Sequence, residues 1–454
     1  MRPGAGAPAV SRLDAAVLQQ EVQRLFEPTA SVAGSGLGRV GVELELIPLN
    51  VRSTDGPIPA DVSGPELLHQ LGADSLGDEQ VGRFSFEPGG QIEYSTPAVT
   101  SLAELVEDMG RSMDPLCTAA RAQGMRLAAI GLAPWYGPEA VGLCNPTRRY
   151  LEMDRYFRRL GPWGAWMMRL TASMQVNLDL GESHTAEARW RVANALSPVL
   201  TAVFANSAAD LPDGTPVASG RAWVWSQLDG SRTGIVGRMG GGTPPWAEYL
   251  TFALTARVMF DHEMKPVESV GGTEPAVRFN DWWIAGSERG PVLEDWHIHL
   301  STLFPDVRPK RWLEIRAIDM PARRWWSVPP TLLAALLYDE RALREVEELF
   351  DTGPDGATAD LSAAACTAGL SNPRLRDLAS VCFEKCESAV RRFPAGWFGG
   401  EAMGALSAFR ERYVEPGMTQ SDEARADGLV AALVPRLQQF SSLPTAASLP
   451  PRSS

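Results

Sequence analysis

The chain has 454 residues, of which 44% are hydrophobic and 21% are charged, and its formal net charge is −13. This composition predicts a folded globular protein with a sizeable core and argues against a disordered chain. It also argues against a nucleic-acid partner, because a surface that follows phosphate groups needs clustered cations.

Several familiar motifs are absent from the sequence. No lysine follows a glycine, which excludes a Walker A loop, and no Gly-x-Gly-x-x-Gly follows a predicted strand. The five cysteines lack C-x-x-C spacing, as expected of reduced thiols. Because no apolar run has the length of a signal peptide or a membrane span, we expect a cytoplasmic protein without a membrane partner.

The first acidic strand is expected at residues 39–46, after a Gly/Ala/Pro-rich leader and a short helix within residues 1–38. Apolar residues alternate there with Glu43 and Glu45, so both glutamates share one face of the strand, about 7 Å apart. Like charges at this distance repel unless a cation or an arginine lies between them. The pattern leaves two interpretations open, a cation site and a solvent-facing strand.

Two further short strands are predicted within residues 83–95, on either side of a Pro-Gly-Gly break. The alternation predicts that Glu87 lies on the polar face of the first strand. It places Gln91 and Glu93 on the polar face of the second.

The most regular alternation spans residues 170–180 and predicts a strand. Its polar face carries Thr171, Ser173, Gln175, Asn177 and Asp179. Solvent-facing strands usually carry Lys, Glu, Arg and Thr, so this row favours a hydrogen-bonded site over a surface. The alternation alone does not decide between them.

An arginine-, tryptophan- and glycine-rich loop is expected at residues 219–242. Its arginines suit the oxygens of a carboxylate or a phosphate, although arginines are also common at surfaces. These residues are Arg221, Arg232 and Arg238. Further along the chain, His297 and His299 are weak candidates for a metal site.

The last strand of this kind is predicted at residues 312–318, where Glu314 and Arg316 share a face. Beyond residue 327 the leucine spacing predicts helices, and the composition of the last residues predicts disorder. We therefore expect four parts: a leader with its helix (1–38), a catalytic core (39–327), a helical part packed on the core (328–440) and a disordered tail (441–454).

Five separated segments thus offer polar side chains at alternate strand positions. Oxygen ligands in excess of cations are what Mg²⁺ or Mn²⁺ needs, and such ions bridge carboxylates to the phosphates of a nucleotide. The pattern therefore favours ATP-dependent phosphoryl transfer.

The same segments resemble a known family. The motifs are Gly41-Val-Glu-Leu-Glu45, the run from Glu87 to Ser95, Met167-Met168 followed by the run from Thr171 to Asp179, Arg232-Thr-Gly234, and Trp312-Leu-Glu-Ile-Arg316. In this order they resemble the glutamate–cysteine ligases of the plant-type carboxylate–amine ligase superfamily. The segment from His299 to Arg308 is most similar to the bacterial branch that serves ergothioneine biosynthesis.

The resemblance implies an α+β fold in which a curved antiparallel β-sheet forms a funnel-shaped active site flanked by helices. ATP and metal ions would occupy one end and glutamate the other. The implied metal ligands are Glu43, Glu45, Glu87, Glu93, Gln175 and Glu314. Arg316 would be the catalytic residue that stabilises the transferring phosphoryl group. The implied substrate-binding residues are Arg149, Tyr150, Asn177 and Arg232.

The implied reaction joins the γ-carboxylate of L-glutamate to the amine of L-cysteine through γ-glutamyl phosphate, with ATP as the phosphoryl donor. Two alternatives stay open: a ligase that uses glutamate with another amine acceptor, and a non-catalytic paralogue that acts as a binding partner. The retained carboxylates and Arg316 argue against the paralogue.

Overall fold

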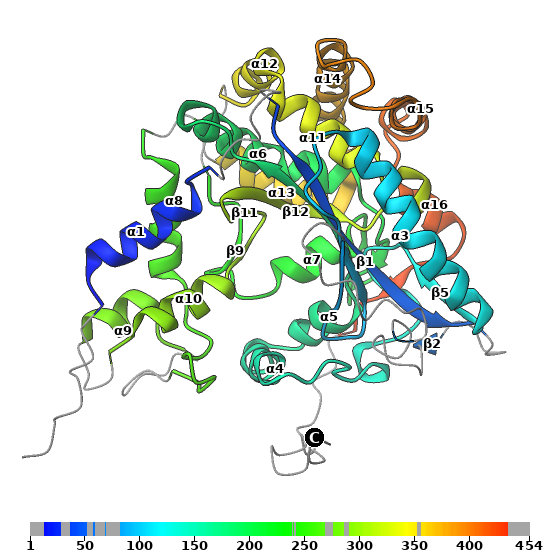
Figure 1. The fold of residues 1–454 in the computed structure, drawn as a ribbon. Coiled ribbons are helices and arrows are strands. Elements are labelled where there is room, and N and C mark those ends of the chain that lie inside the picture. Colours follow the sequence, from blue (N-terminus) through cyan, green and yellow to red (C-terminus); the bar gives the residue numbers. More distant parts are fainter. Residues whose placement is uncertain are drawn as a thin grey trace, which may run out of the picture.

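The computed structural model describes residues 13–28, 37–51, 58–59, 69, 82–237, 239, 242–267, 276–285, 290–351 and 356–434. The leader before residue 13, Arg238 and the predicted tail at 441–454 lie outside these residues. Figure 1 shows strands through the middle of the molecule and helices on both sides of them.

An antiparallel sheet forms the centre of the described fold. Its main path, in hydrogen-bonded order, is β11 (Val307–Pro309), β12 (Trp312–Asp319), β6 (Ser173–Asp179), β1 (Val40–Asn50), β4 (Ile92–Ser95) and β3 (Arg83–Phe86). The second half of β1 also pairs with β2 (Ile58–Pro59) and β5 (Met125–Ala128). The predicted α+β fold with an antiparallel sheet is confirmed, and the long strand β1 lies at its centre.

The apolar side chains of the central strands form a buried layer. Leu44, Met174 and Ile315 are fully buried, and burying a side chain of this kind stabilises the fold by roughly 1.5–3 kcal/mol. Helices α3 (Leu102–Ala122), α6 (Ser183–Val203) and α11 (Val328–Tyr338) pack against strands of the sheet. The polar face of the sheet lies on the side of α4 (Arg148–Leu160), α5 (Trp163–Leu170) and α7 (Gly220–Ser226). Figure 1 shows α4 and α5 well apart from α6 and α11.

The remaining elements surround this layer. The helices are α1 (Ala15–Leu25), α8 (Pro245–Thr255), α9 (Phe279–Ala285), α10 (Leu293–Ser301), α12 (Glu340–Phe350), α13 (Gly356–Ala368), α14 (Pro373–Val390), α15 (Gly400–Phe409) and α16 (Gln420–Ala426). β7 (Ala209–Asp210), β8 (Pro216–Val217) and β13 (Ala431–Ala432) form one small sheet, and β9 (Thr233–Gly234) with β10 (Phe304–Pro305) another. Within the described part of the chain, no helix is long and apolar enough to cross a membrane.

The predicted C-terminal helices are present and pack on the rest of the chain. Helices α12, α13 and α14 contact α6, which belongs to the predicted core, and α11 contacts α12, α14 and α15. A domain boundary at residue 327 stays a prediction.

Two segments differ from the expectation. The strand predicted at 170–180 begins only at Ser173, because helix α5 extends to Leu170 and Thr171 is its C-cap. Gly164 lies inside that helix, where an added Cβ would come within 2.2 Å of the Cβ of Phe157. The predicted loop at 219–242 begins with helix α7, whose first turn is capped by the Ser219 side chain.

The hydroxyl of Tyr338 links helix α11 to the backbone at the end of the central strands. The Oη of Tyr338 donates to the backbone oxygen of Arg39 and accepts from the backbone N–H of Asp179 at 2.8 Å. Arg189 of α6 lies 4.6 Å from the centre of the Tyr338 ring and donates to the backbone oxygen of Leu337. Tyr338 is 4% exposed, so water cannot readily replace these bonds.

We expect Tyr338→Phe to lower the free energy of unfolding by about 1–3 kcal/mol, because it removes two hydrogen bonds that the buried hydroxyl makes to backbone groups at the end of the central strands. Chemical denaturation of the two proteins measures the difference. Tyr136→Phe is the matched control, because the Tyr136 hydroxyl makes no hydrogen bond to the described residues, and its stability should change by less than about 0.5 kcal/mol. Equal effects of the two substitutions would contradict the role assigned to Tyr338.

Candidate active site

A cavity of about 300 Å³ lies on the polar face of the sheet. Strand residues form one wall, and α4, α5, α7 and the segment from residue 301 to 310 form the others. Of the sequence-predicted site residues, those that line it are Glu43, Glu45, Glu87, Glu93, Arg149, Tyr150, Gln175 and Arg316. Most of the polar strand positions predicted from alternation therefore face one cavity, whereas Asn177, Asp179 and Glu314 do not line it.

The strand register brings the acidic side chains together. β1 pairs with β4 so that Glu45 is directly opposite Glu93, and with β6 so that Glu43 is directly opposite Gln175. Directly opposed residues in an antiparallel pair have their Cβ atoms about 5 Å apart. Residues that are distant in the sequence thus become neighbours on one face.

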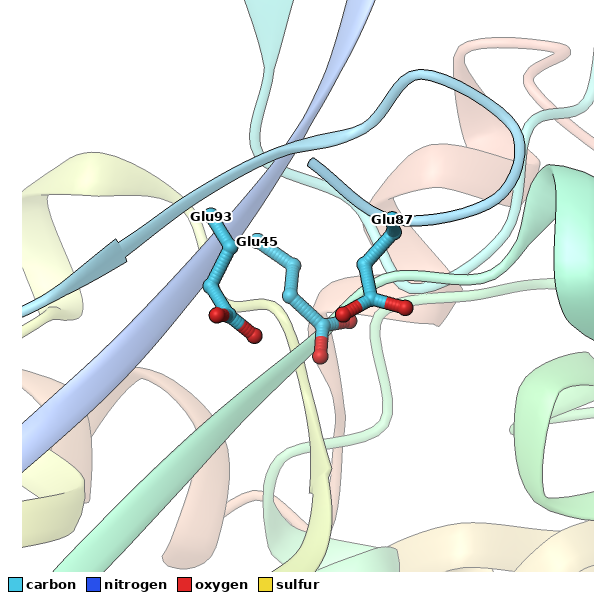
Figure 2. A group of neighbouring side chains, drawn as sticks. All are labelled: Glu45, Glu87 and Glu93. Carbon is cyan, nitrogen blue, oxygen red and sulfur yellow. The ribbon is translucent and has the colours of Figure 1, made fainter. Parts of the chain in front are cut away.

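Glu45, Glu87 and Glu93, here called the acidic trio, each present a carboxylate oxygen within 4.8 Å of the others. Figure 2 shows the three side chains pointing toward one another. Glu87 lies in the turn after β3, where its backbone N–H donates to Gln91 and its carbonyl accepts from Gly90. The turn depends on glycine, because Gly90 has a φ of 84° and a Cβ on Gly89 would lie 2.5 Å from the backbone of Arg169.

Hydrogen bonds hold two members of the acidic trio in place. Glu45 accepts from the backbone N–H of Ser173 at 2.7 Å and from Nε2 of Gln175 at 3.0 Å. Glu93 accepts from the hydroxyl of Ser85 at 2.6 Å. These donors are neutral, so they fix the carboxylates without cancelling their charge.

Desolvation and the repulsion between neighbouring carboxylates raise the pKa values of Glu43, Glu87 and Glu93. Desolvation first, and then Glu93 and Glu45, raise the pKa of Glu87 well above its usual value. Desolvation and Glu45 also raise the pKa of Glu93. Burial, with the nearby charges of Glu314 and Glu93, raises the pKa of Glu43 to about 8. A divalent cation would relieve this repulsion, so the donor set fits Mg²⁺ or Mn²⁺.

Glu314 has a different environment from the other predicted metal ligands. Its side chain is fully buried, and its carboxylate pairs with Arg316 at 2.5 Å, with Arg308 at 3.3 Å and with Lys310. Burial alone would raise its pKa, but Arg308, Arg316 and Lys310 together lower the pKa to about 2. A carboxylate whose charge three cations already balance is a poor ligand for a further cation, so the geometry favours another role for Glu314.

Gln175 connects the two differently charged sides of the cavity. Its Nε2 donates to Glu45, and its Oε1 accepts from Nη1 of Arg316 at 2.5 Å. An amide can do both at once because it carries a donor and an acceptor. The side chain of Gln175 therefore lies between Glu45 of the acidic trio and Arg316.

Arg149 and Tyr150 reach the cavity from the first turn of α4. Arg149 donates to the hydroxyl of Ser301 at 2.9 Å and to its backbone oxygen at 2.8 Å. Burial lowers the pKa of Arg149 and raises that of Tyr150. Both residues are held by the fold and still face the cavity.

Asn177 and Arg232 do not line the cavity. The Nδ2 of Asn177 donates to Glu43 at 3.3 Å, and its Oδ1 accepts from Trp312 at 3.0 Å. Asn177 therefore supports Glu43.

Arg232 is fully buried, with bonds to Asp229 at 3.2 Å, to the backbone oxygen of Thr302 at 2.7 Å and to the backbone oxygen of Arg257. These bonds occupy the guanidinium group within the scaffold, so this geometry offers no direct substrate contact.

The weak histidine pair does not form a metal site. Both residues lie on α10, where His299 is buried and bonds to the backbone oxygen of Ala253 at 2.8 Å. Burial lowers its pKa to about 3. His297 is exposed and pairs with Glu21 at 2.9 Å.

Several cavity residues were missed by the sequence reasoning. These include Trp225, Phe304, Arg308 and Lys310. Lys310 carried a usable signal, because it is one of only three lysines and precedes Glu314 by four residues. The sequence indicated that Arg221 suits carboxylate or phosphate oxygens but could not assign it to this cavity. Helix α7, which carries Arg221, reaches the cavity only through tertiary packing.

Comparisons with known proteins agree with the motif resemblance. The family model for glutamate–cysteine ligase family 2 (GCS2) matches residues 39–436. The glutamate–cysteine ligase EgtA of Mycobacterium tuberculosis is 34% identical over 364 residues, covering 77% of this chain and 78% of that protein. EgtA of Mycolicibacterium smegmatis is 32% identical over 409 residues, covering 89% of this chain and 91% of that protein.

A solved glutamate–cysteine ligase from Francisella tularensis in complex with AMP covers 86% of this chain and 84% of that chain, at 12% identity and a TM-score of 0.48. Because the family model spans most of the chain, and the EgtA sequences align over most of it, the chain belongs to glutamate–cysteine ligase family 2 and is an ATP-dependent ligase.

Proposed function

We propose that this protein joins the γ-carboxylate of L-glutamate to the amine of L-cysteine with ATP, and forms γ-glutamylcysteine through γ-glutamyl phosphate. The observation that carries the proposal is the composition of one cavity, which has the acidic trio on one side and Arg308, Lys310 and Arg316 on the other. A ligand with a metal-bound polyphosphate is complementary to both sides.

The acidic trio would hold Mg²⁺, or Mn²⁺ in its place, with Glu43 and Gln175 beside it. The bound ions would neutralise charge between the carboxylates and the nucleotide phosphates. We do not assign Glu314 to this ligand set, because its cationic partners already balance its charge. Support for the assignment comes from the closeness of the three carboxylates and from the raised pKa values of Glu87 and Glu93.

Arg316 is the candidate for stabilising the transferring phosphoryl group. Its guanidinium lines the cavity, and Glu314 and Gln175 hold one end of it. A planar guanidinium fixed at one end presents its other N–H groups in a defined direction, which suits phosphate oxygens. The reaction needs no covalent nucleophile from the protein, so positioning and charge stabilisation are its main contributions.

Arg149 and Tyr150 are the candidates for binding the glutamate substrate. Arg149 offers a charged donor at the α4 side of the cavity, while Ser301 fixes its direction. Asn177 and Arg232 would act indirectly, Asn177 through Glu43 and Arg232 by holding the segment around Asp229.

We further propose a role in ergothioneine biosynthesis in the cytoplasm. The support is the resemblance of the segment from His299 to Arg308 and the similarity to the EgtA proteins. Two alternatives are kept, a different amine acceptor and a non-catalytic paralogue. The complete acidic trio and Arg316 favour a catalytic protein over the paralogue.

ADP release from the purified protein tests the function directly. With ATP, Mg²⁺ and L-glutamate, we expect release only when an amine is added, with L-cysteine giving the highest kcat/KM among the amino acids. A higher kcat/KM with another amine would show that this amine, and not L-cysteine, is the acceptor. If no amine caused ADP release, the non-catalytic paralogue would be favoured. Removal of Mg²⁺ by a chelator should abolish the signal.

We expect Arg316→Lys to lower kcat about a hundredfold, equivalent to about 3 kcal/mol, and to change the KM for glutamate much less. Lysine keeps the charge but loses the planar fork that contacts two oxygens at once. Arg410→Lys is the control, since Arg410 pairs with Glu387 outside the cavity. An unchanged kcat with a lowered Tm would show that Arg316 has only a structural role.

Matched substitutions of Glu87 and Glu314 should have opposite effects on stability. In metal-free buffer at pH 8, Glu87→Gln removes a charge from a repelling group whose folded pKa is raised, so the free energy of unfolding should stay equal or rise. Glu314→Gln leaves buried cations without their partner and should cost about 3 kcal/mol or more.

Both variants should lose most of their turnover, for different reasons. Denaturation curves recorded without metal separate the two cases. A loss of stability in Glu87→Gln as large as that in Glu314→Gln would contradict the assignment of the acidic trio as the repelling cation site.

A further inference from the structure

Helix α1 is docked on the rest of the chain although it lies before the residues that match the family model. That match begins at residue 39. The helix packs against α8, and Figure 1 shows the two beside each other. The backbone oxygen of Leu13 accepts from Nε1 of Trp283 at 2.8 Å, and Glu21 pairs with His297 at 2.9 Å. These contacts fix α1 in one position.

The C-terminal end of α1 contacts the tip of the hairpin that β11 and β12 form. The last carbonyl groups of a helix have no partner within the helix, so they are free to accept hydrogen bonds from other segments. Here the backbone oxygen of Leu25 accepts from the backbone N–H of Arg311 at 2.7 Å. Arg311 lies between the two strands, and the same hairpin carries Arg308 and Lys310, which line the cavity.

The backbone of Arg311 has a strained conformation. Its φ is 68°, in the left-handed region that residues with a Cβ rarely adopt. Such a conformation persists only where the surrounding contacts determine it. The exposed side chain of Arg311 makes no hydrogen bond or ion pair with the described residues, so it does not provide these contacts. The bond to Leu25 is therefore one of the contacts that hold the tip.

Phe26, which follows the last residue of α1, fixes the position of Leu25. Its ring packs edge-to-face against Trp190 of α6 at 5.2 Å and against Tyr249 of α8 at 6.2 Å, measured between ring centres. Both partners are almost completely buried, so they form a rigid socket. Aromatic pairs of this geometry stabilise a contact beyond the area that they bury. Because Phe26 adjoins Leu25, loss of its ring would loosen the carbonyl from the hairpin tip.

We propose that α1 is a positioning element of the active site, in which Phe26 and the carbonyl of Leu25 hold the tip of the β11–β12 hairpin. The anchored tip sets the positions of Arg308 and Lys310 on the cavity wall. Phe26 does not line the cavity and acts only through the hairpin. The anchoring depends on the contacts described above, and only its effect on catalysis rests on the proposed function.

Hydrogen exchange of the segment 307–316, followed by mass spectrometry, measures the anchoring directly. In Phe26→Ala we expect its backbone amides to exchange about tenfold faster or more, because the tip opens more often. Phe350→Ala is the matched control, since Phe350 is also partly buried but ends α12 in the C-terminal part. Its hairpin amides should exchange as in the unmodified protein. Unchanged exchange in Phe26→Ala, or equal acceleration in both variants, would overturn the proposal.

A glycine at position 311 separates positioning from general destabilisation. Glycine adopts a positive φ without a steric cost, so the tip can keep its conformation with a weaker anchor. Arg311→Gly alone should leave exchange and turnover nearly unchanged. Combined with Phe26→Ala, it should restore most of the protection that Phe26→Ala loses. A double variant that exchanges as fast as Phe26→Ala would show that α1 does not hold the strained tip.

Turnover of the same variants tests the catalytic consequence. In the ADP-release assay, kcat/KM for ATP should fall several-fold in Phe26→Ala and recover in the double variant, because a displaced cavity wall binds substrate in a poorer geometry. Circular dichroism verifies that each variant is folded. If Phe26→Ala does not fold, Phe26→Leu replaces it, with smaller shifts in the same direction, because leucine keeps apolar bulk but not the ring pairs.

Faster exchange of the hairpin with an unchanged kcat/KM would refute the positioning role. A protein whose hairpin responds as expected, but which releases no ADP with any amine, would refute the proposed reaction and leave the anchoring by α1 standing.

Discussion

The pairing of β1 between β4 and β6 is the constraint on which the site depends. It sets Glu45 opposite Glu93 and Glu43 opposite Gln175 on one face. A shift of one residue would turn the glutamates of β1 toward the core and its valines and leucines toward the cavity. Because Val42 and Leu44 are buried almost completely, their packing enforces the register. The hydrophobic layer therefore determines where the carboxylates lie.

The carboxylates of Glu45 and Glu93 bond to neutral donors and not to the cations of the same cavity. In contrast, Arg308, Lys310 and Arg316 surround one buried carboxylate, that of Glu314. Gln175 contacts both sides and prevents a direct ion pair between Glu45 and Arg316. Such an arrangement is unfavourable in the empty protein, and under the proposed function a bound metal and the nucleotide phosphates would offset this cost. The surrounding helices must therefore contribute stability that the site does not.

Helix α11 shows how that stability is provided. All of its residues are buried, and it contacts β1 and β6 on one side and α12, α14 and α15 on the other. Through Tyr338 it also satisfies backbone groups at the end of the central strands. The C-terminal helices thus support the sheet that carries the site, and the match to the family model, which ends at residue 436, includes them.

The sequence by itself determined the strands that carry chemistry and the faces of their side chains, because alternation with a period of two is a local property. Glu43, Glu45, Glu93, Gln175 and Arg316 were assigned to a common site in this way, with the family resemblance supplying their roles. The tertiary structure alone decided which charges meet. Glu314 has the same local pattern as Glu43, yet the β11–β12 pairing surrounds it with cations. Arg232 lies in a family motif, yet its neighbours Asp229 and Thr302 keep it within the scaffold. Spacing along a strand fixes the face of a side chain, but its electrostatic environment depends on residues that only folding brings near.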